Sequence, residues 1–340
     1  MSKMRRSIVQ KLRRLTYRQW AAIGFVLLIA ICTFDSWRLY SRVMAFHHFS
    51  RRVGTSIQRN KHGPEWLRSR VPAWVRENVL ETPHAVWIQG NSPDADERLA
   101  DLRSLPTVRS LTVLGSKRES KAVSNADADK WHRQAALIGR LTQLHRLSLN
   151  VSDADLNELA KLTELRQLDF DGDRLSGAAL RALIPMRNLR ELVIKNANDD
   201  SLSGLAEMPG LEILDLSQTD ITDEGLKHLE GHPRLFSLKL ASTNIADYGL
   251  HSLATLTSLT SLDLQSTKIS DEGLPSLARL PRLQFLKLGG TAITDASIPQ
   301  LIQMPSLRLL SMVGSSVTVD GYLQYARACP NVTLPMPYRF

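Results

Sequence analysis

The sequence predicts an α/β solenoid, in which similar strand–turn–helix units stack and share one core. The first observation behind this prediction is a leucine pattern that recurs every 24 residues, with starts at Leu211, Leu235, Leu259, Leu283 and Leu307. The second is a change of apolar spacing inside each unit, from two residues to three. A fixed period between about 20 and 50 residues is typical of stacked repeats, because one such unit cannot bury its apolar face alone.

Each unit is expected to open with a short strand. In the unit that starts at Leu211, the apolar residues Leu214 and Leu216 flank a polar residue. This alternation indicates a strand with one buried face, because successive side chains of a strand point to opposite sides.

A short helix is expected after the turn. Leu226, Leu229 and His232 are spaced by three and form one apolar stripe. Pairs of short oxygen side chains precede this stripe, at a place where such a side chain caps free backbone N–H groups; they are Thr222-Asp223, Ser270-Asp271 and Thr294-Asp295. We interpret the recurring aspartates as such caps, without a bound ion; they are Asp223, Asp247, Asp271 and Asp295.

Less regular units precede the periodic part. The units that start at Leu144, Leu165 and Leu189 are 21, 24 and 22 residues long. Val108 and Val86 mark two more degraded units upstream.

About ten repeats are therefore expected over residues 83–331. Residues 64–82 are expected to cap the N-terminal end and residues 332–340 to form the C-terminal edge, since an open solenoid end would expose the core. Residues 115–129 interrupt the series. Insertions in solenoids map to surface loops, and this one is either a binding loop or an insert of no consequence.

These units resemble the leucine-rich repeat family, and the wording Thr-x-Ile-Thr-Asp-x-Gly-Leu is similar to its ribonuclease-inhibitor-like bacterial subclass. The resemblance implies a right-handed horseshoe with parallel strands on the concave side and helices on the convex side. Many family members carry Asn at the ninth position, where this chain has Thr219, Thr243, Thr267 and Thr291. We expect the hydroxyl to bond the turn backbone in place of the amide.

The first 63 residues predict a membrane anchor. Residues 20–34 carry no charge, and the segment from Tyr17 to Trp37 is 21 residues long, or about 31 Å as a helix. We expect a basic tail over residues 1–19, a transmembrane signal-anchor helix over residues 20–37 and a juxtamembrane linker over residues 38–63. A cleaved signal peptide remains the main alternative.

Charge predicts the orientation of this anchor. Seven cations precede the apolar segment and four follow it by residue 52. Because Lys and Arg prefer the cytoplasmic side, the tail should be cytoplasmic and the repeats should lie in the periplasm or at the cell surface. The plan of basic tail, apolar segment and repeats resembles the membrane-anchored leucine-rich repeat proteins of planctomycete-like bacteria.

The distribution of charge argues against nucleic acid as a partner. Residues 1–82 carry a net charge of +12, whereas the remaining residues carry −3. The basic arm is expected to attract anionic lipid headgroups, which contribute about 1 kcal/mol per cation near the surface. Cys32 lies in the apolar segment and Cys329 in the last repeat, so an intrachain disulfide is not expected.

The concave face is the candidate binding surface, because parallel strands offer a broad, rigid platform. On adjacent strands we expect a ladder of alternating charge, formed by Asp215, Lys239, Asp263 and Lys287. Such pairs are explained by stability alone. The same face carries the apolar residues Ile213, Phe236, Phe285 and Leu309, which are typical anchors of an interface, although scattered surface apolar residues are also common.

No pattern of residues predicts catalysis, a cofactor or a metal. His228 and His232 are four residues apart, but His232 stands where later repeats carry Leu256 and Leu280, which indicates a core position. The sequence contains no phosphate-binding loop, nucleophile elbow or zincin motif.

These observations predict a membrane-anchored, non-catalytic protein that binds an unidentified protein or peptide ligand outside the cytoplasm. One alternative is a structural or self-associating scaffold of the bacterial envelope. A second is a cytoplasmic substrate adaptor, which is disfavoured because an apolar segment precedes the repeats.

Overall fold

The computed structural model describes residues 55–61, 81–105, 107–114, 125–170 and 175–335. The expected basic tail and transmembrane helix lie outside these residues, as does most of the expected N-terminal cap. Strand β1 (Thr55–Lys61) occupies part of the segment expected to be a linker. Among the residues described, no helix is both long and apolar enough to cross a membrane.

The strands form one stack in the order of the chain, from β1 to β11. Every neighbouring pair from β2 to β11 is parallel, so the predicted α/β solenoid with parallel strands is confirmed. The strands after β1 are β2 (Glu81–Gln89), β3 (Ser110–Leu114), β4 (Arg146–Leu149), β5 (Gln167–Phe170), β6 (Glu191–Ile194), β7 (Ile213–Asp215), β8 (Ser237–Lys239), β9 (Ser261–Asp263), β10 (Phe285–Lys287) and β11 (Leu309–Ser311).

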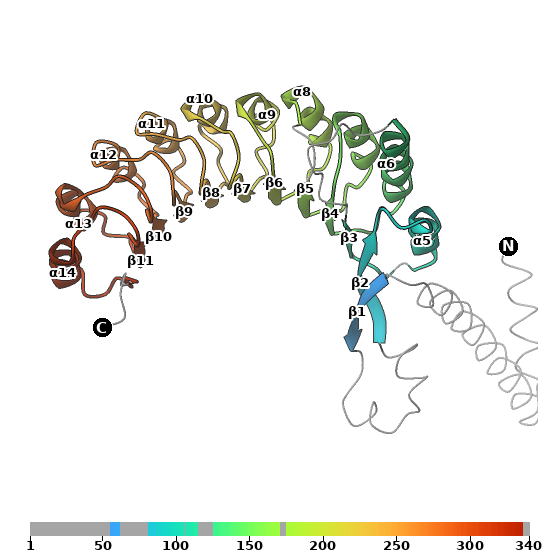
Figure 1. The fold of residues 1–340 in the computed structure, drawn as a ribbon, viewed down its shortest axis with the longest axis horizontal. Coiled ribbons are helices and arrows are strands. Elements are labelled where there is room, and N and C mark those ends of the chain that lie inside the picture. Colours follow the sequence, from blue (N-terminus) through green and yellow to red (C-terminus); the bar gives the residue numbers. More distant parts are fainter. Residues whose placement is uncertain (1–54, 62–80, 106, 115–124, 171–174, 336–340) are drawn as a thin grey trace, which may run out of the picture. The chain divides into compact units, whose positions relative to one another are not determined.

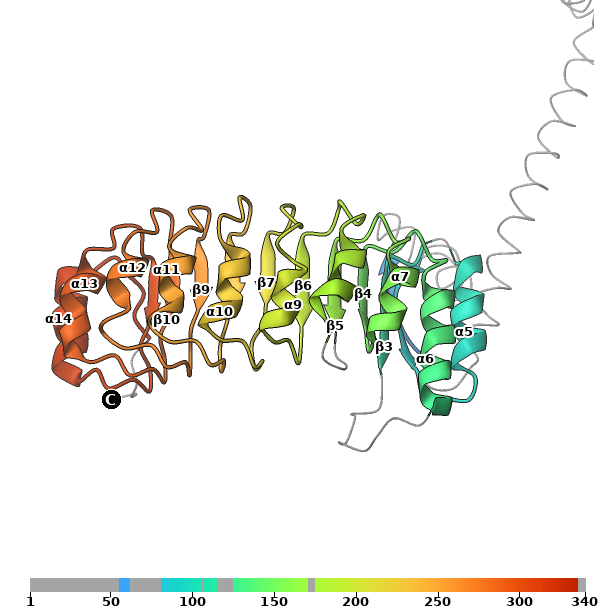
Figure 2. The ribbon, with the colours of Figure 1, turned by 90° about the horizontal axis from the view of Figure 1, so that it is seen from above.

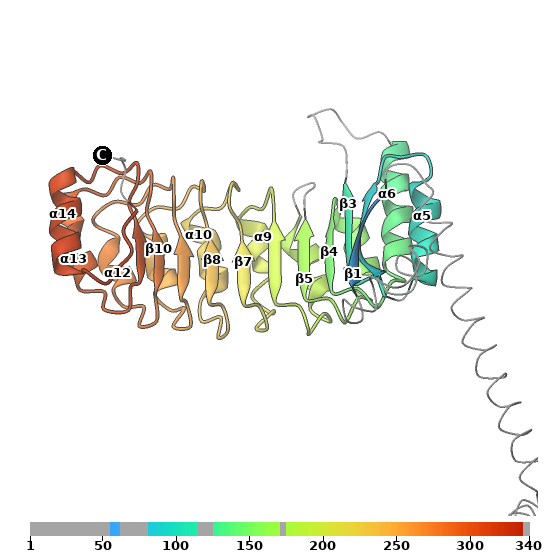
Figure 3. The same cartoon turned by 90° about the horizontal axis from the view of Figure 1, so that it is seen from below.

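Helices follow the strands and cover the other side of the stack. In the compact unit that contains the described residues from 83 onward, the strands line the inner side of a curve and the helices its outer side (Figure 1). Figure 2 presents the row of helices, and Figure 3 the row of strands. The α-helices are α5 (Ala95–Asp101), α6 (Asn125–Ile138), α7 (Leu156–Leu159), α8 (Gly177–Leu180), α9 (Asp199–Ser203), α10 (Asp223–Leu226), α11 (Gly249–Leu253), α12 (Leu274–Leu277), α13 (Ile298–Ile302) and α14 (Val319–Ala328). Short 3₁₀ helices are η2 (Leu102–Ser104), η3 (Asp153–Asp155), η4 (Arg181–Leu183), η5 (Lys227–Leu229) and η6 (Asp295–Ser297).

The repeated leucines form a core that runs through the stack. In the repeat that starts at Leu235, the strand residues Leu238 and Leu240 and the helix residues Leu250 and Leu253 are completely buried. Burying one such side chain contributes about 1.5–3 kcal/mol. Because Leu238 pairs with a leucine of the strand on either side, each repeat completes the core of its neighbours.

The threonine at the ninth position holds the turn that follows each strand. Thr243 Oγ1 donates a hydrogen bond to the carbonyl of Leu240 at 2.7 Å, and Thr219, Thr267 and Thr291 make the equivalent bond. The expected role of this hydroxyl is confirmed. The residue just before it has a left-handed backbone, as at Ser242 (φ 58°) and Gly290 (φ 67°); glycine adopts this conformation without the steric cost that a side chain brings.

The recurring aspartates connect neighbouring repeats. Asp247 Oδ1 accepts a hydrogen bond from the N–H of Ser270 at 2.8 Å, and Oδ2 accepts one from the Ser270 hydroxyl at 2.5 Å. The same pair of bonds joins Asp199 to Thr222, Asp271 to Thr294 and Asp295 to Thr318. The helix cap is the hydroxyl itself, since Thr222 Oγ1 accepts from the N–H of Glu224. The expected cap is thus confirmed at Thr222, and likewise at Thr294. The interpretation of the aspartates as caps of their own helices is wrong.

The interruption before the fourth strand is partly helical. Residues 125–129, expected to belong to a loop, form the start of α6, and residues 115–124 lie outside the described part of the chain. Gln134 of this helix donates to the carbonyl of Gly90 at 2.9 Å and to Asp96 Oδ1 at 3.0 Å. The longer helix is thus tied to the preceding repeat.

Helix α14 closes the stack with aromatic side chains. Tyr322 and Tyr325 occupy the places of Leu226 and Leu229 and are buried. Burial raises the pKa of Tyr322 to about 12. A parallel bridge joins Leu309 of β11 to Thr333, which belongs to the segment expected to form the C-terminal edge.

Candidate functional site

The charged row on the concave strands consists of two ion pairs. Lys239 Nζ lies 3.0 Å from Asp215 Oδ2, and Lys287 Nζ lies 2.8 Å from Asp263 Oδ2. Lys239 and Asp263 are register neighbours, but within the described part of the chain no ion pair joins them. The four charges therefore form two separate ion pairs and not the continuous ladder that was expected.

Backbone hydrogen bonds fix the acidic members of these pairs. Asp215 accepts from the N–H of Ser217, and Asp263 accepts from the N–H of Gln265. Burial of Asp215 opposes its ionisation, but hydrogen bonds from Lys239 and Ser217 outweigh this effect and lower its pKa. The aspartates thus have a structural role, which leaves the exposed lysine heads as the part of the row that a partner can reach.

The four apolar candidates fall into two groups on either side of β9. Phe285 is 42% exposed and lies opposite the half-buried Leu309 of the next strand. Ile213 is half-buried and pairs with the first residue of β8, directly after Phe236. Phe236 is 38% exposed and precedes its strand. The residue of β9 that pairs with Phe285 is Ser261, so the two groups do not form one continuous apolar patch.

Two further features of the concave side are absent from the sequence-based candidates. Val313, in the turn after β11, is 38% exposed; comparison with Ala241 and Gly289 at the same repeat position could have identified it. A polar hollow of about 260 Å³ lies over β3, β4 and β5 and is lined in part by Arg146 and Asp169. The sequence of the irregular upstream repeats did not predict this hollow.

The histidines are not arranged as a metal site. His232 is buried in the core, as its repeat position predicts, whereas His228 is exposed. Within the part of the chain that the structure describes, no group of three or more His, Cys, Asp or Glu side chains could hold a metal ion.

Comparison with solved structures finds distant neighbours. An internalin (inlF) from Listeria monocytogenes is 18% identical, with a TM-score of 0.49, and the match covers 69% of each chain. A second Listeria monocytogenes internalin (inlC2) is 24% identical, with a TM-score of 0.41, over 54% of this chain and 84% of that one. A TDR receptor is 14% identical, with a TM-score of 0.41, over 59% of this chain and 40% of the receptor. No curated protein matches the chain.

A family model matches two segments of the chain. Residues 209–229 and 255–278 match the model described as "Leucine Rich repeat". Both segments lie in the region where the 24-residue period, one parallel strand per repeat and the buried leucines coincide. These two segments are therefore leucine-rich repeats, and the repeats around them share their period.

Proposed function

We propose that the chain is a non-catalytic binding module whose concave face captures a protein or peptide ligand. The observation that carries this proposal is the exposed Phe285 beside Leu309, on strands whose backbones are already paired on both sides. A preformed surface loses little conformational entropy on binding, and a partly exposed aromatic side chain is a typical anchor of an interface.

The charged row adds specificity to this surface. Lys287 follows Phe285 by two residues, so both side chains lie on the same face of β10. The Lys287 side chain is 47% exposed although it pairs with Asp263. A ligand with an apolar side chain and a nearby carboxylate would complement this arrangement.

We further propose that residues 20–37 anchor the chain in a membrane, with the repeats outside the cytoplasm and the basic arm against anionic lipid headgroups. Support comes from the uncharged segment, its flanking aromatic residues and the excess of cations before it. Protease added to intact spheroplasts should digest the repeats. Protection of the repeats would contradict the proposed orientation.

The concave site is tested by affinity capture with the full-length chain as bait. Replacing both phenylalanines (Phe236→Ala with Phe285→Ala) should abolish recovery of a specific partner without lowering the melting temperature, because both side chains are exposed. Tyr248→Ala is the matched control, since Tyr248 is an exposed aromatic residue next to α11, on the helix side. Unchanged capture by the double variant would exclude this patch. Recovery of the chain itself as the only partner would favour the structural, self-associating alternative.

A further inference from the structure

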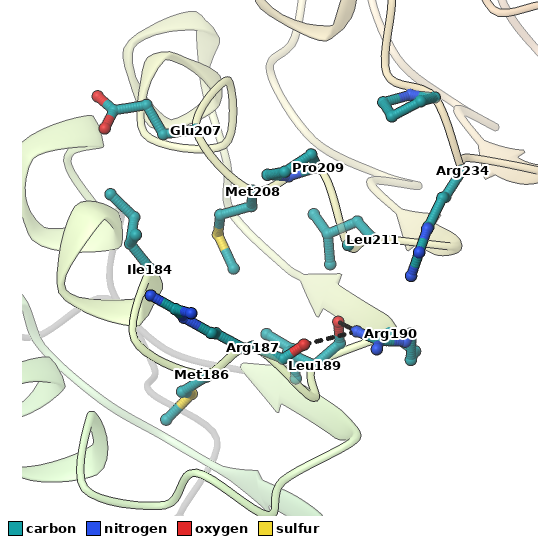
Figure 4. Close-up of a pocket in the computed structure, with 12 residues that line it drawn as sticks. Ile184, Met186, Arg187, Leu189, Arg190, Glu207, Met208, Pro209, Leu211 and Arg234 are labelled. Atoms are coloured by element: carbon teal, nitrogen blue, oxygen red, sulfur yellow. Dashed lines mark hydrogen bonds between the residues drawn. The ribbon is translucent and has the colours of Figure 1, made fainter.

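A groove of about 550 Å³ lies apart from the concave patch (Figure 4). It is formed near β6 and β7 by the return segments, which connect the helix of each repeat to the next strand. Its volume is within the range of about 300–1,000 Å³ that is typical of ligand pockets. The lining is largely apolar and includes Met186, Leu189, Met208, Leu211 and Pro209. Met186, Leu189, Met208 and Leu211 are at most 7% exposed. The apolar surface that the groove presents to a ligand is therefore that of Ile184, Pro209 and Pro233.

The groove coincides with a shortened repeat. The repeat that starts at Leu189 has 22 residues, whereas the repeats that start at Leu165 and Leu211 each have 24. Its return segment, which contains Met208 and Pro209, lines the groove together with residues from both neighbours. The two missing residues precede α9, because Leu202, Leu205 and Leu211 keep the spacing of Leu226, Leu229 and Leu235. The return segment itself has its usual length.

Cationic side chains surround this apolar lining. Arg187, Arg190 and Arg234 line the groove, and Glu207 is the acidic residue among the lining residues. Glu207 pairs with Arg181 at 3.5 Å, and Arg190 pairs with Glu212 at 3.2 Å.

The other two arginines of the groove are exposed and uncompensated. Within the part of the chain that the structure describes, neither the Arg187 nor the Arg234 guanidinium forms an ion pair, and both side chains are exposed. Because the acidic residues at the groove already have partners, the groove presents a net positive charge to a ligand.

A row of three arginines and one histidine leads to the same groove. Arg109, His145, Arg166 and Arg190 hold the second position of consecutive repeats, and the N–H of each later residue donates to the carbonyl of the one before it. Neighbouring strands are about 4.8 Å apart. Burial and the charges of Arg109 and Arg166 lower the pKa of His145, which is consistent with this closeness. With its pKa lowered, His145 is neutral at neutral pH, so the charges of the row are those of Arg109, Arg166 and Arg190, and Arg190 is paired with Glu212.

We propose that the groove and the adjoining row bind an extended acidic peptide segment of a partner protein. One large apolar side chain of the segment enters the groove, and flanking carboxylates bind Arg187, Arg234 and the row that ends at Arg190. Guanidinium groups suit carboxylates because two parallel N–H groups can donate to the two oxygens. This site is separate from the concave patch and does not depend on the proposed function.

Fluorescence anisotropy with the full-length chain tests this proposal. The probe is a fluorescein-labelled peptide with a central tryptophan and glutamates on both sides. We expect saturable binding that weakens with added salt. Replacing the tryptophan with serine, or the glutamates with lysines, should weaken binding about tenfold or more, because each change removes one of the two complementary features.

Charge reversal in the protein locates the site. Arg187→Glu with Arg234→Glu should weaken binding of the glutamate peptide about tenfold or more. Arg279→Glu with Arg282→Glu is the matched control, since Arg282 holds the same repeat position as Arg234, outside the groove. Both pairs are exposed, so melting temperatures should stay close to that of the unchanged chain. Phe285→Ala alone should retain peptide binding, because Phe285 holds the third position of its repeat, outside the row. This variant separates failure of this site from failure of the concave site.

Three outcomes would overturn the proposal. The first is equal binding of the glutamate and lysine peptides. The second is unchanged binding by the Arg187→Glu and Arg234→Glu variant, or an equal loss in the control pair. The third is absence of peptide binding while the groove variant loses adhesion to phosphatidylglycerol vesicles and the control does not, which would assign the cationic surface to a lipid membrane.

Discussion

At the scale of single residues, His232 is a polar, ionisable side chain that lies in the apolar core. Its ring fills a core position that Leu256 and Leu280 take in later repeats. Neither ring nitrogen has a hydrogen-bond partner among the described residues. Burial lowers the pKa of His232 below its ordinary value of 6.5. The side chain is therefore neutral in the folded chain at neutral pH.

Replacing this histidine with the residue of its sister repeats should stabilise the protein. His232→Leu should raise the free energy of unfolding by about 1 kcal/mol at neutral pH, because an unpartnered polar group leaves the core. As the pH falls below 6.5, the unfolded chain binds a proton at His232 that the folded chain does not, so stability falls. The His232→Leu variant should lack the part of the pH dependence of stability that protonation of His232 causes.

Denaturant unfolding from about pH 7.5 to 5.5 measures both effects. His228→Leu is the control, because His228 is exposed on the same helical segment. If the free energy of unfolding has the same pH dependence in His232→Leu and in the unchanged chain, protonation of His232 does not cause that dependence.

The sequence predicted the position of His232 but not its lack of partners. Its spacing from Leu226 and Leu229 was enough to place the side chain inward. The groups around an inward side chain come from neighbouring repeats, such as Leu205 in the preceding one. No pattern within a single repeat contains that information.

At the scale of elements, the link between repeats is an aspartate that holds the start of the next helix. Gly273 belongs to the same arrangement, since a Cβ atom there would lie 2.4 Å from Asp247 Oδ1. The recurring Asp and Gly of the motif are thus parts of one contact between coils. The sequence showed their period, but the partner is 23 residues away, so the pattern within one repeat did not identify the next repeat as the place where the aspartate bonds.

Removing one of these aspartates should loosen a single junction. Asp247→Ala should lower the free energy of unfolding by about 1–3 kcal/mol, because the N–H of Ser270 loses its acceptor in a partly buried place. Glu272→Ala is the control, since Glu272 is exposed near the same helix, and should change stability by less than about 0.5 kcal/mol. Equal effects of the two substitutions in thermal unfolding would contradict the role of the aspartate.

At the scale of the whole molecule, the two candidate binding surfaces differ in how far the sequence predicted them. The strand positions placed Phe285 and Lys287 on the concave face directly, because side chains alternate along a strand. The groove with Arg187 and Arg234 depends instead on how three return segments meet beside a shortened repeat. Contacts between return segments depend on how the repeats stack, so the residue spacing within one repeat does not predict them.

The shared core is the central claim, and amide hydrogen exchange tests it most directly. Leu262 of β9 is buried and pairs with Leu238 and Leu286 of the adjacent strands. Leu262→Ala should cost about 2–5 kcal/mol and leave a cavity at the centre of the stack. We predict that protection of backbone amides falls in β8, β9 and β10 together, because each repeat completes the core of its neighbours. Loss of protection confined to residues 259–282 would contradict the shared core.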